Sequence, residues 1–224
     1  MSQSRDTTMT MRRWRHVAVT LFLLSITAAV SSRADVIDRI LAVVGRELIT
    51  LSDATAALKL GLVPAPAPGT DAVRTTLDVL ISRQLELAEA NRYQPPEPPA
   101  AEVDARLEAI RTRAATPEAF ATTLAEAGLS EEQLRLRLRD DLRIEAFLAQ
   151  RFGSTRQPSD QELQDYYRVH QADYTTPAGV RPFAEVHDAI QAQVIALQRA
   201  ALISDWLEGL RRRTEIADLY VTAR

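Results

Sequence analysis

Cysteine is absent from the 224 residues, lysine occurs once, at Lys59, and aromatic residues make up 5% of the chain. Without cysteine the chain can form no disulfide, carry no lipid on cysteine, use no thiol in catalysis and ligate no zinc through sulfur. This absence suits an oxidising compartment, where a spare thiol is a liability. The other basic residues are arginine, which we attribute to genomic base composition.

The usual sequence patterns of catalytic and cofactor sites are absent as well. No H-E-x-x-H, G-x-S-x-G, P-loop or G-x-G-x-x-G pattern occurs, and the seven glycines are isolated from one another. Of the three histidines, His16 lies in the N-terminal segment, and we expect His170 and His187 on solvated helix faces. Asp140 and Asp141 diverge by about 100° on a helix and are expected on a solvated face too. We therefore predict no catalytic residue, cofactor or metal.

The first segment, residues 1–34, is predicted to be a secretory signal. A basic region at residues 12–15 precedes an apolar run at residues 17–30, and residues 32–34 form a small-x-small cleavage pattern. The apolar run is shorter than the ~20 residues with which a helix spans a bilayer. We place the mature start at Asp35 and expect no stable membrane insertion; an uncleaved anchor is the alternative.

The mature chain is acidic. Residues 1–34 hold five arginines and one aspartate, so the remainder has 22 basic and 29 acidic residues, a net charge of −7. This balance argues against nucleic acid or an anionic membrane surface as the main partner. The arginine run at residues 211–213 ends a predicted helix, where cations offset the helix dipole.

The early part of the mature chain predicts a β-hairpin followed by two helices. Valine and isoleucine are frequent in residues 36–44, Gly45 interrupts, and residues 47–50 read as a second strand. Thr50 and Asp53 fit the start of a helix that ends near Gly61. The proline-rich residues 62–69 form a loop, and residues 71–93 show helical apolar spacing.

Three more helices follow in the middle of the chain. They cover residues 101–114, then 117–128, and then a helix that begins at Ser130 with a capping box to Gln133. Alternating leucine and arginine at residues 134–139 also fit a strand, but the capping box and the spacing of Leu134, Leu138 and later apolar residues favour the helix.

The last part of the chain predicts a short helix, a long helix and a strand. Ser159 and Glu162 form a second capping box, and Pro182 starts a helix that runs to about Arg213. Residues 216–221 read as a strand whose natural partner is the N-terminal hairpin. The predicted fold is mainly α, a multi-helix core with a small sheet made from both chain ends. The predicted core positions of the long helix are Phe183, Val186, Ile190, Val194, Leu197, Ala201, Trp206 and Leu210.

Several motifs in this order resemble the SurA-type periplasmic chaperones. They are the hairpin with Ser52-Asp53, the helix LDVLISRQLELAEA, the pair FATTLAEAGLSEEQLRLRLRDDLRIEAFL, the block SDQELQDYYRVHQADY, and FAEVHDAIQAQV through WLEGLRRRTEI. The resemblance implies an N-terminal chaperone domain at residues 35–176, completed by a long helix and strand at residues 177–224. It also implies a periplasmic location.

The chain departs from that family in one respect. The family inserts parvulin-type prolyl isomerase domains of roughly 100 residues before its C-terminal helix, whereas here only a short stretch separates Tyr167 from Pro182. The resemblance therefore implies a chaperone without isomerase activity that binds unfolded polypeptides, above all outer-membrane proteins. A dedicated interaction subunit of an envelope or secretion assembly is the alternative, and a divergent prolyl isomerase the second. A homodimer stays open.

A peptide-binding groove is expected between the long C-terminal helix and the helices of residues 71–152. Apolar residues along these helices serve either the core or the groove, and periodicity does not separate the two. Tyr167 and Trp206 fit the core better than the groove. The residues predicted to contact a peptide are Leu134, Leu138, Phe147, Tyr166 and Trp206.

Overall fold

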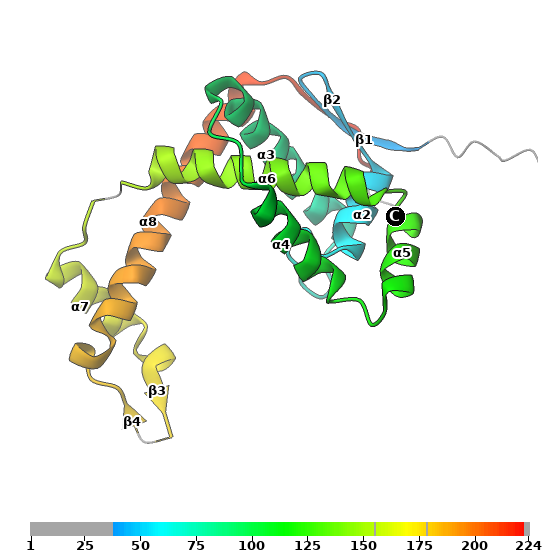
Figure 1. The fold of residues 1–224 in the computed structure, drawn as a ribbon. Coiled ribbons are helices and arrows are strands. Elements are labelled where there is room, and N and C mark those ends of the chain that lie inside the picture. Colours follow the sequence, from blue (N-terminus) through cyan, green and yellow to red (C-terminus); the bar gives the residue numbers. More distant parts are fainter. Residues whose placement is uncertain (1–37, 155, 178, 222–224) are drawn as a thin grey trace, which may run out of the picture. The chain divides into compact units, whose positions relative to one another are not determined.

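Three strands from distant parts of the chain form one antiparallel sheet. The structure, a computed structural model, describes residues 38–154, 156–177 and 179–221, so the predicted secretory signal lies outside the described residues. Strand β1 (Ile40–Val44) lies between β2 (Glu47–Thr50) and β5 (Ile216–Asp218) (Figure 1). Gly45, at φ 61°, allows the two-residue turn between β1 and β2. The predicted pairing of the C-terminal strand with the hairpin is confirmed.

Helices make up most of the described residues, as predicted. They are α2 (Leu51–Lys59), α3 (Ala72–Tyr93), α4 (Ala100–Arg111), α5 (Pro117–Glu126), α6 (Glu131–Phe152), α7 (Asp160–Val169) and α8 (Phe183–Arg213), with the 3-10 helix η1 (Gln171–Tyr174). A small hairpin of β3 (Thr175–Thr176) and β4 (Gly179–Val180) precedes α8. Within the described ranges, no helix is both long enough and apolar enough to cross a membrane.

Polar residues at the helix starts explain where several helices begin. At α6 the Ser130 side chain accepts from the Gln133 N–H at 3.1 Å, while the Gln133 side chain accepts from the Ser130 N–H at 2.7 Å. This reciprocal pair satisfies two amides that the first turn leaves free. The helical prediction for residues 134–139 is confirmed over the alternative strand.

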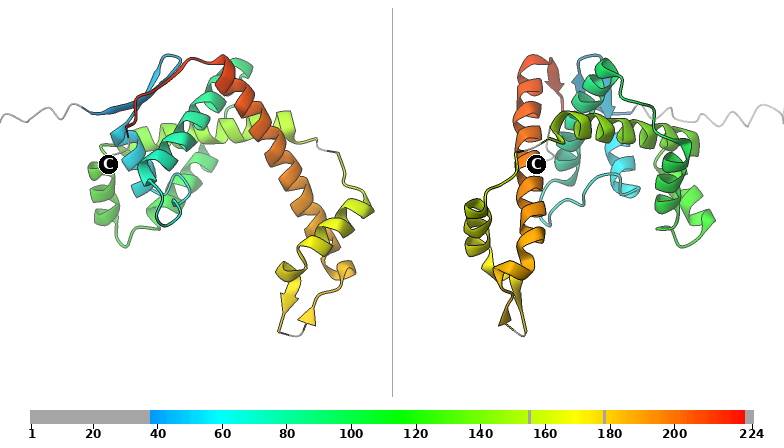
Figure 2. Two further views of the ribbon diagram at one scale, coloured as in Figure 1. Left: turned by 180° about the vertical axis from the view of Figure 1, so that it is seen from behind. Right: turned by 60° about the vertical axis from the view of Figure 1, so that its left-hand side comes forward.

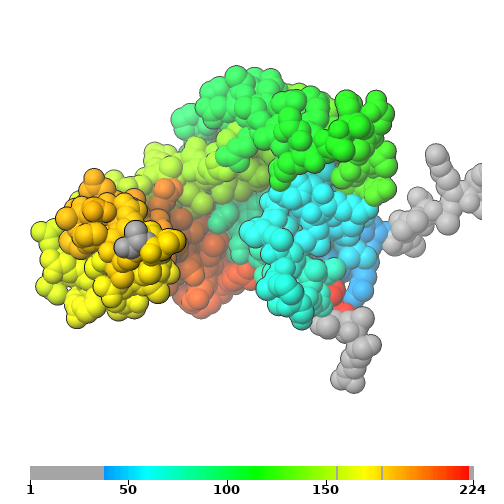
Figure 3. All heavy atoms as spheres, turned by 90° about the horizontal axis from the view of Figure 1, so that it is seen from below, coloured from blue at the N-terminus to red at the C-terminus, as the bar shows by residue number. Residues whose placement is uncertain are grey.

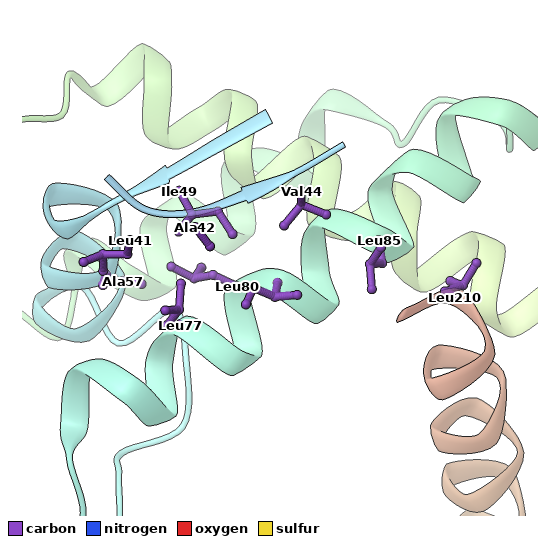
Figure 4. Packing of buried hydrophobic residues seen from close by; sticks show 11 residues of the cluster. Leu41, Ala42, Val44, Ile49, Ala57, Leu77, Leu80, Leu85 and Leu210 are labelled. Carbon is purple, nitrogen blue, oxygen red and sulfur yellow. The ribbon is translucent and has the colours of Figure 1, made fainter. Parts of the chain in front are cut away.

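The first apolar cluster lies between the sheet and α3. In Figure 4, Leu77 and Leu80 of α3 point toward Ala42 and Ile49 of the hairpin, and Leu210 of α8 lies near Leu85. Strand residues alternate between the two faces of the sheet, so β1 and β2 give α3 an apolar face. Residues from the beginning, middle and end of the chain thus share one core.

Two further clusters extend this core along α6. Leu134 and Leu138 of α6 contact apolar residues of α4 and α5 in one cluster, and Phe147 contacts Ala90 of α3 in the other. We call these three clusters together the main core. It is built from the sheet, α2 to α6 and the C-terminal half of α8.

A fourth apolar cluster forms a separate module. It joins Leu163 of α7 to Val186 and Ile190 in the N-terminal half of α8. Both views of Figure 2 show α7 beside that half of α8, and in Figure 3 the yellow and light-orange atoms of this region gather together. We call α7, η1, the β3–β4 hairpin and this half of α8 the α7–α8 module.

The described residues from Asp38 onward belong to one compact unit. The long helix α8 takes part in both the main core and the α7–α8 module, because Leu210 is buried in the first and Ile190 in the second. The proposed division at residues 35–176 and 177–224 stays a prediction.

Candidate peptide-binding surface

The five residues predicted to contact a peptide lie in three places. Leu134 and Leu138 are buried beneath α4 and α5, and Tyr166 lies in the α7–α8 module. Phe147 and Trp206 come together, with their ring centroids 5.7 Å apart. In the described conformation Leu134, Leu138 and Phe147 contact protein neighbours and leave almost no surface free. A role for any of the five in peptide binding stays a prediction.

Phe147 and Trp206 belong to an aromatic cluster where α3, α6 and α8 meet. Tyr93 stacks on Phe147 at 5.5 Å between ring centroids, and Phe152 lies 5.5 Å from Trp206. The Arg151 guanidinium lies over both the Phe152 and Trp206 rings, at 5.4 and 5.5 Å. Cation–π contacts of this kind add an electrostatic attraction to the apolar packing of the cluster. Tyr93 and Phe152 were not predicted to be part of this cluster, although both lie at the ends of predicted helices.

The middle of α8 exposes an unusually uncharged surface. Residues 189–204 include a single charged residue, Arg199. Leu197 and Leu202 are each 48% exposed, whereas solvated helix faces are normally rich in charge. Leu197 was predicted in the core together with Ala201; both are exposed, so this prediction is wrong.

Helix geometry explains the exposed Leu197. Val186, Ile190 and Leu197 recur at intervals of four and seven residues and therefore share one face of α8. At Val186 and Ile190 this face is buried within the cluster that includes Leu163 of α7. At Leu197 the apolar face continues, but no described element covers it to the same degree. The face thus extends beyond the module that buries its first half.

A cluster of charges joins α3 to α6. The Arg83 Nε donates to Asp141 Oδ1 at 2.6 Å and its Nη2 donates to the Arg137 carbonyl at 3.2 Å, while Arg137 pairs with Asp53. Burial raises the pKa of the Asp141 carboxyl, although Arg83 opposes the shift, and burial likewise raises the pKa of Glu86. The side chains of Asp140 and Asp141 are 25% and 28% exposed, so the expected solvated face is wrong for both.

The two histidines in the described part of the chain, His170 at the C-cap of α7 and His187 on α8, make local contacts. The His170 ring stacks on Tyr166 at 3.9 Å, and its Nδ1 lies 2.9 Å from the Tyr166 carbonyl oxygen. His187 lies edge-on to Phe183 and 3.0 Å from an Asp188 carboxylate oxygen. Across residues 38–154, 156–177 and 179–221, no group of three or more histidine, aspartate and glutamate side chains is placed to hold a metal.

Hollows border the main core. A shallow apolar one of about 680 Å³ lies beside α5, and a smaller one of about 120 Å³ lies beside β2. The Arg111 guanidinium lies over Phe120 in the first, 5.5 Å from the ring centroid. The second is lined by Leu48, Ile49, Asp53, Leu80, Arg83, Gln84 and Arg137.

Comparison with known proteins adds one likeness. No protein-family profile matches the chain, and no curated protein matches it. A solved structure of one of two related SurA-like chaperones from Campylobacter jejuni, the virulence factor PEB4 and the periplasmic protein Cj1289, is similar to it. The two share 15% sequence identity and a TM-score of 0.50 over 82% of this chain and 100% of the other. At this identity the likeness is one of fold: the chain has a mainly helical core with a small antiparallel sheet, similar to that of a SurA-like chaperone.

Proposed function

We propose that this chain is an ATP-independent chaperone of the periplasm, which binds unfolded outer-membrane or secreted polypeptides and has no prolyl isomerase activity. The fold likeness to a SurA-like chaperone supports the class of function. The stretch between Tyr167 and Pro182 supports the second part, because it consists of the end of α7, η1 and the short β3–β4 hairpin. The predicted secretory signal at residues 1–34 supports the location.

The uncharged middle of α8 is the observation that carries the proposal. Exposed apolar side chains cost free energy in water, and exposed apolar surface can mark an interaction site. Leu197 and Leu202, with the alanines around them, offer contacts that depend little on the partner's sequence. A surface of this kind suits many unfolded segments better than one folded partner.

The energetics fit reversible holding without ATP. Burying ~500 Å² of apolar surface contributes roughly 12 kcal/mol. Loss of translational, rotational and chain freedom offsets a large share of that gain. A net value of about −8 kcal/mol corresponds to a micromolar dissociation constant. Clients bound with this affinity would be held and then released by dilution or by transfer to an acceptor.

The test is suppression of aggregation when a urea-unfolded porin is diluted into buffer. We expect the wild-type protein to suppress light scattering at an equimolar ratio. The double variant Leu197→Glu/Leu202→Glu should need at least about tenfold more protein, because it places two charges in the uncharged surface. Leu136→Glu is the matched control, since Leu136 is an exposed leucine of α6, 43% exposed, in an arginine-rich stretch.

Three outcomes separate this proposal from the alternatives. No suppression by the wild-type protein would reject the chaperone function. If Leu136→Glu suppressed aggregation as poorly as the Leu197→Glu/Leu202→Glu variant, the α8 surface would not be the site. Stable co-purification with one folded partner, without capture of unrelated unfolded chains, would favour a dedicated interaction subunit. A protease-coupled proline-isomerisation assay should show no activity above background.

A further inference from the structure

Strand β2 is an open edge of the three-stranded sheet. The strand order is β2-β1-β5, so β1 is paired on both sides and β2 on one. In the described part of the chain, no strand pairs with the other side of β2. An open edge presents main-chain N–H and C=O groups that another extended chain can pair with.

The hydrogen bonds of β1 identify which residue of β2 faces outward. The Gly45 N–H donates to the Glu215 carbonyl, and the Leu219 N–H donates to the Leu41 carbonyl, each at 2.9 Å. Leu41 and Gly45 therefore turn their main-chain groups toward β5. Because alternate residues of a strand face opposite sides, Ala42 and Val44 turn theirs toward β2.

Leu48 is the outward-facing residue of β2. The partners of Ala42 and Val44 are Ile49 and Glu47, so these two residues of β2 bond toward β1. Leu48 lies between them and turns both its N–H and its C=O away from β1. Leu48 as a whole residue is 55% exposed, so part of it is open to solvent.

The hollow of about 120 Å³ runs along this edge. Leu48 and Ile49 both line it, and adjacent strand residues point to opposite faces of a sheet, so a hollow that touches both lies at the strand's edge. The opposite wall consists of Leu80, Arg83 and Gln84 of α3 with Arg137 of α6. This arrangement leaves a groove between a free strand edge and two helices.

The groove offers hydrogen-bond donors without a net positive charge. Among the described residues, Arg83 uses its Nε and Nη2, and Arg137 uses one terminal nitrogen, so each guanidinium keeps further N–H groups without a described acceptor. Asp141 and Asp53 neutralise the two arginines. A neutral acceptor such as a peptide carbonyl therefore suits this groove better than a free anion.

We propose that an extended segment of a client polypeptide adds to the open edge of β2 as a further strand, paired through the main chain of Leu48. This inference rests on the proposed chaperone function and names the part of the client that is recognised. Main-chain pairing is shared by every sequence without proline at the paired position, so it supplies affinity without side-chain specificity. The uncharged surface of α8 then receives apolar side chains, and the edge of β2 receives main chain.

The first test uses the ligand and leaves the protein unchanged. The probe is a fluorescent peptide of about ten residues with a non-repeating sequence and no proline, with one backbone nitrogen methylated at a time. Strand addition through Leu48 predicts that methylation weakens binding about tenfold at the nitrogen that pairs with Leu48 and has little effect at the two neighbouring nitrogens, which point away from β2. A uniform response along the peptide would overturn the proposal, because a purely side-chain mode does not single out one peptide N–H.

The second test changes the edge. Leu48→Pro removes the outward N–H and leaves the bonds of Glu47 and Ile49 toward β1 in place, whereas Leu48→Ala removes most of the side chain and keeps the main chain. We expect Leu48→Pro to weaken peptide binding about tenfold and Leu48→Ala to weaken it much less. Circular dichroism checks the fold of each variant. If Leu48→Pro does not fold, the methylation series is the deciding test of strand addition.

The outcomes distinguish this inference from the proposed function. If the wild-type protein binds the peptide and a folded Leu48→Pro variant binds it equally well, strand addition is overturned and the chaperone proposal stands. No binding of the peptide and no protection of the porin by the wild-type protein would overturn both. A dimer that Leu48→Pro disperses without changing peptide binding would show that a second copy occupies the edge.

Discussion

The main core and the α7–α8 module differ in how far apart along the chain their contacts lie. The main core joins Leu41, Leu77 and Leu210, which come from the beginning, middle and end of the described chain. The module joins Leu163 to Val186 and Ile190, all within a short part of the sequence. Distant contacts make the main core cooperative, whereas local contacts allow the module to open by itself.

The two regions also differ in how aromatic rings take part in them. In the main core Phe120 and Phe147 are buried among leucine, isoleucine, valine and alanine, whereas in the module partly buried aromatic rings pack around the aliphatic residues Leu163, Val186 and Ile190. Tyr167 lies 5.7 Å from both Tyr174 and Phe183, measured between ring centroids, and its hydroxyl donates to the Arg181 carbonyl at 2.6 Å. These rings surround the few aliphatic residues at the centre of the module and add contact area to a small cluster.

The largest effect is expected from Leu77→Ala in the main core. Leu77 is fully buried between the hairpin and α3. The substitution should lower the free energy of unfolding by about 2–5 kcal/mol, because it removes apolar contacts and leaves a cavity. Urea unfolding followed by circular dichroism measures it. A change confined to one part of the helical signal would contradict the cooperative main core.

Ile190→Ala makes a comparable change in the module. Ile190 is also fully buried, so the side-chain chemistry of the two substitutions is similar while their surroundings differ. We expect faster amide hydrogen exchange in α7 and the N-terminal half of α8, with exchange in α3 unchanged, because the module opens locally. Equal acceleration in α3 would show that module and main core unfold together and would break the comparison.

The sequence predicted most of the elements because their signals are local. Thr50, Ser130 and Ser159 each form the expected N-cap, and Ser130 settles the choice between helix and strand for α6. The pairing of β5 with the hairpin was also predicted, because two strands alone are marginal. The β3–β4 hairpin was missed, since two-residue strands leave no periodic pattern.

The candidate surface was less predictable for a physical reason. Leu197 continues the same apolar face as Ile190, and only the extent of α7 determines that one is exposed and the other buried. The pairing of Arg83 with Asp141 depends on how α3 crosses α6, which no local pattern gives. Periodicity identifies an apolar face, but it does not identify what covers that face.

The main core and the α7–α8 module also differ in the pKa shifts of their carboxylates. Arg83→Met should lower the free energy of unfolding by about 1–3 kcal/mol at pH 7, because it leaves the partly buried Asp141 carboxylate without its partner. Burial raises the folded pKa of Asp141, so stability from this group is greatest below its unfolded pKa and falls as pH rises through the folded value. The loss of stability in the variant should therefore shrink as the pH falls from 7 to about 4, close to the ordinary aspartate pKa of 3.8.

Urea unfolding at both pH values measures this deficit. The double variant Arg83→Met/Asp141→Asn is the matched control, because asparagine carries no charge to bury. It should be more stable than Arg83→Met at pH 7 and should show less dependence on pH. A deficit of equal size at both pH values would mean that Arg83 acts through packing alone.

The smallest change in stability is expected in the α7–α8 module. There, stability should fall as the pH is lowered, opposite to the effect expected in the main core. The Arg156 guanidinium, 2.5 Å away, and the Ser159 N–H and hydroxyl lower the pKa of Glu162 to about 2. Because the folded pKa lies below the unfolded one, stability from Glu162 is complete above pH 4.5 and is lost as pH falls toward about 2. Amides of the first turn of α7 should therefore exchange faster as the pH falls through that window, after correction for intrinsic exchange.

The capping box of α6 offers an internal reference for this prediction, because its third residue is the neutral Gln133. Glu162→Gln keeps an acceptor for the Ser159 N–H, so it should remove the pH dependence at α7 and preserve the helix start. Glu162→Ala should remove both the dependence and the cap. If the first turns of α6 and α7 responded equally to acid in the wild-type protein, the titrating group would lie outside these boxes. In that case acid would change the stability of both regions in the same direction. The pKa shifts of Asp141 and Glu162 predict instead that acid stabilises the main core and destabilises the module.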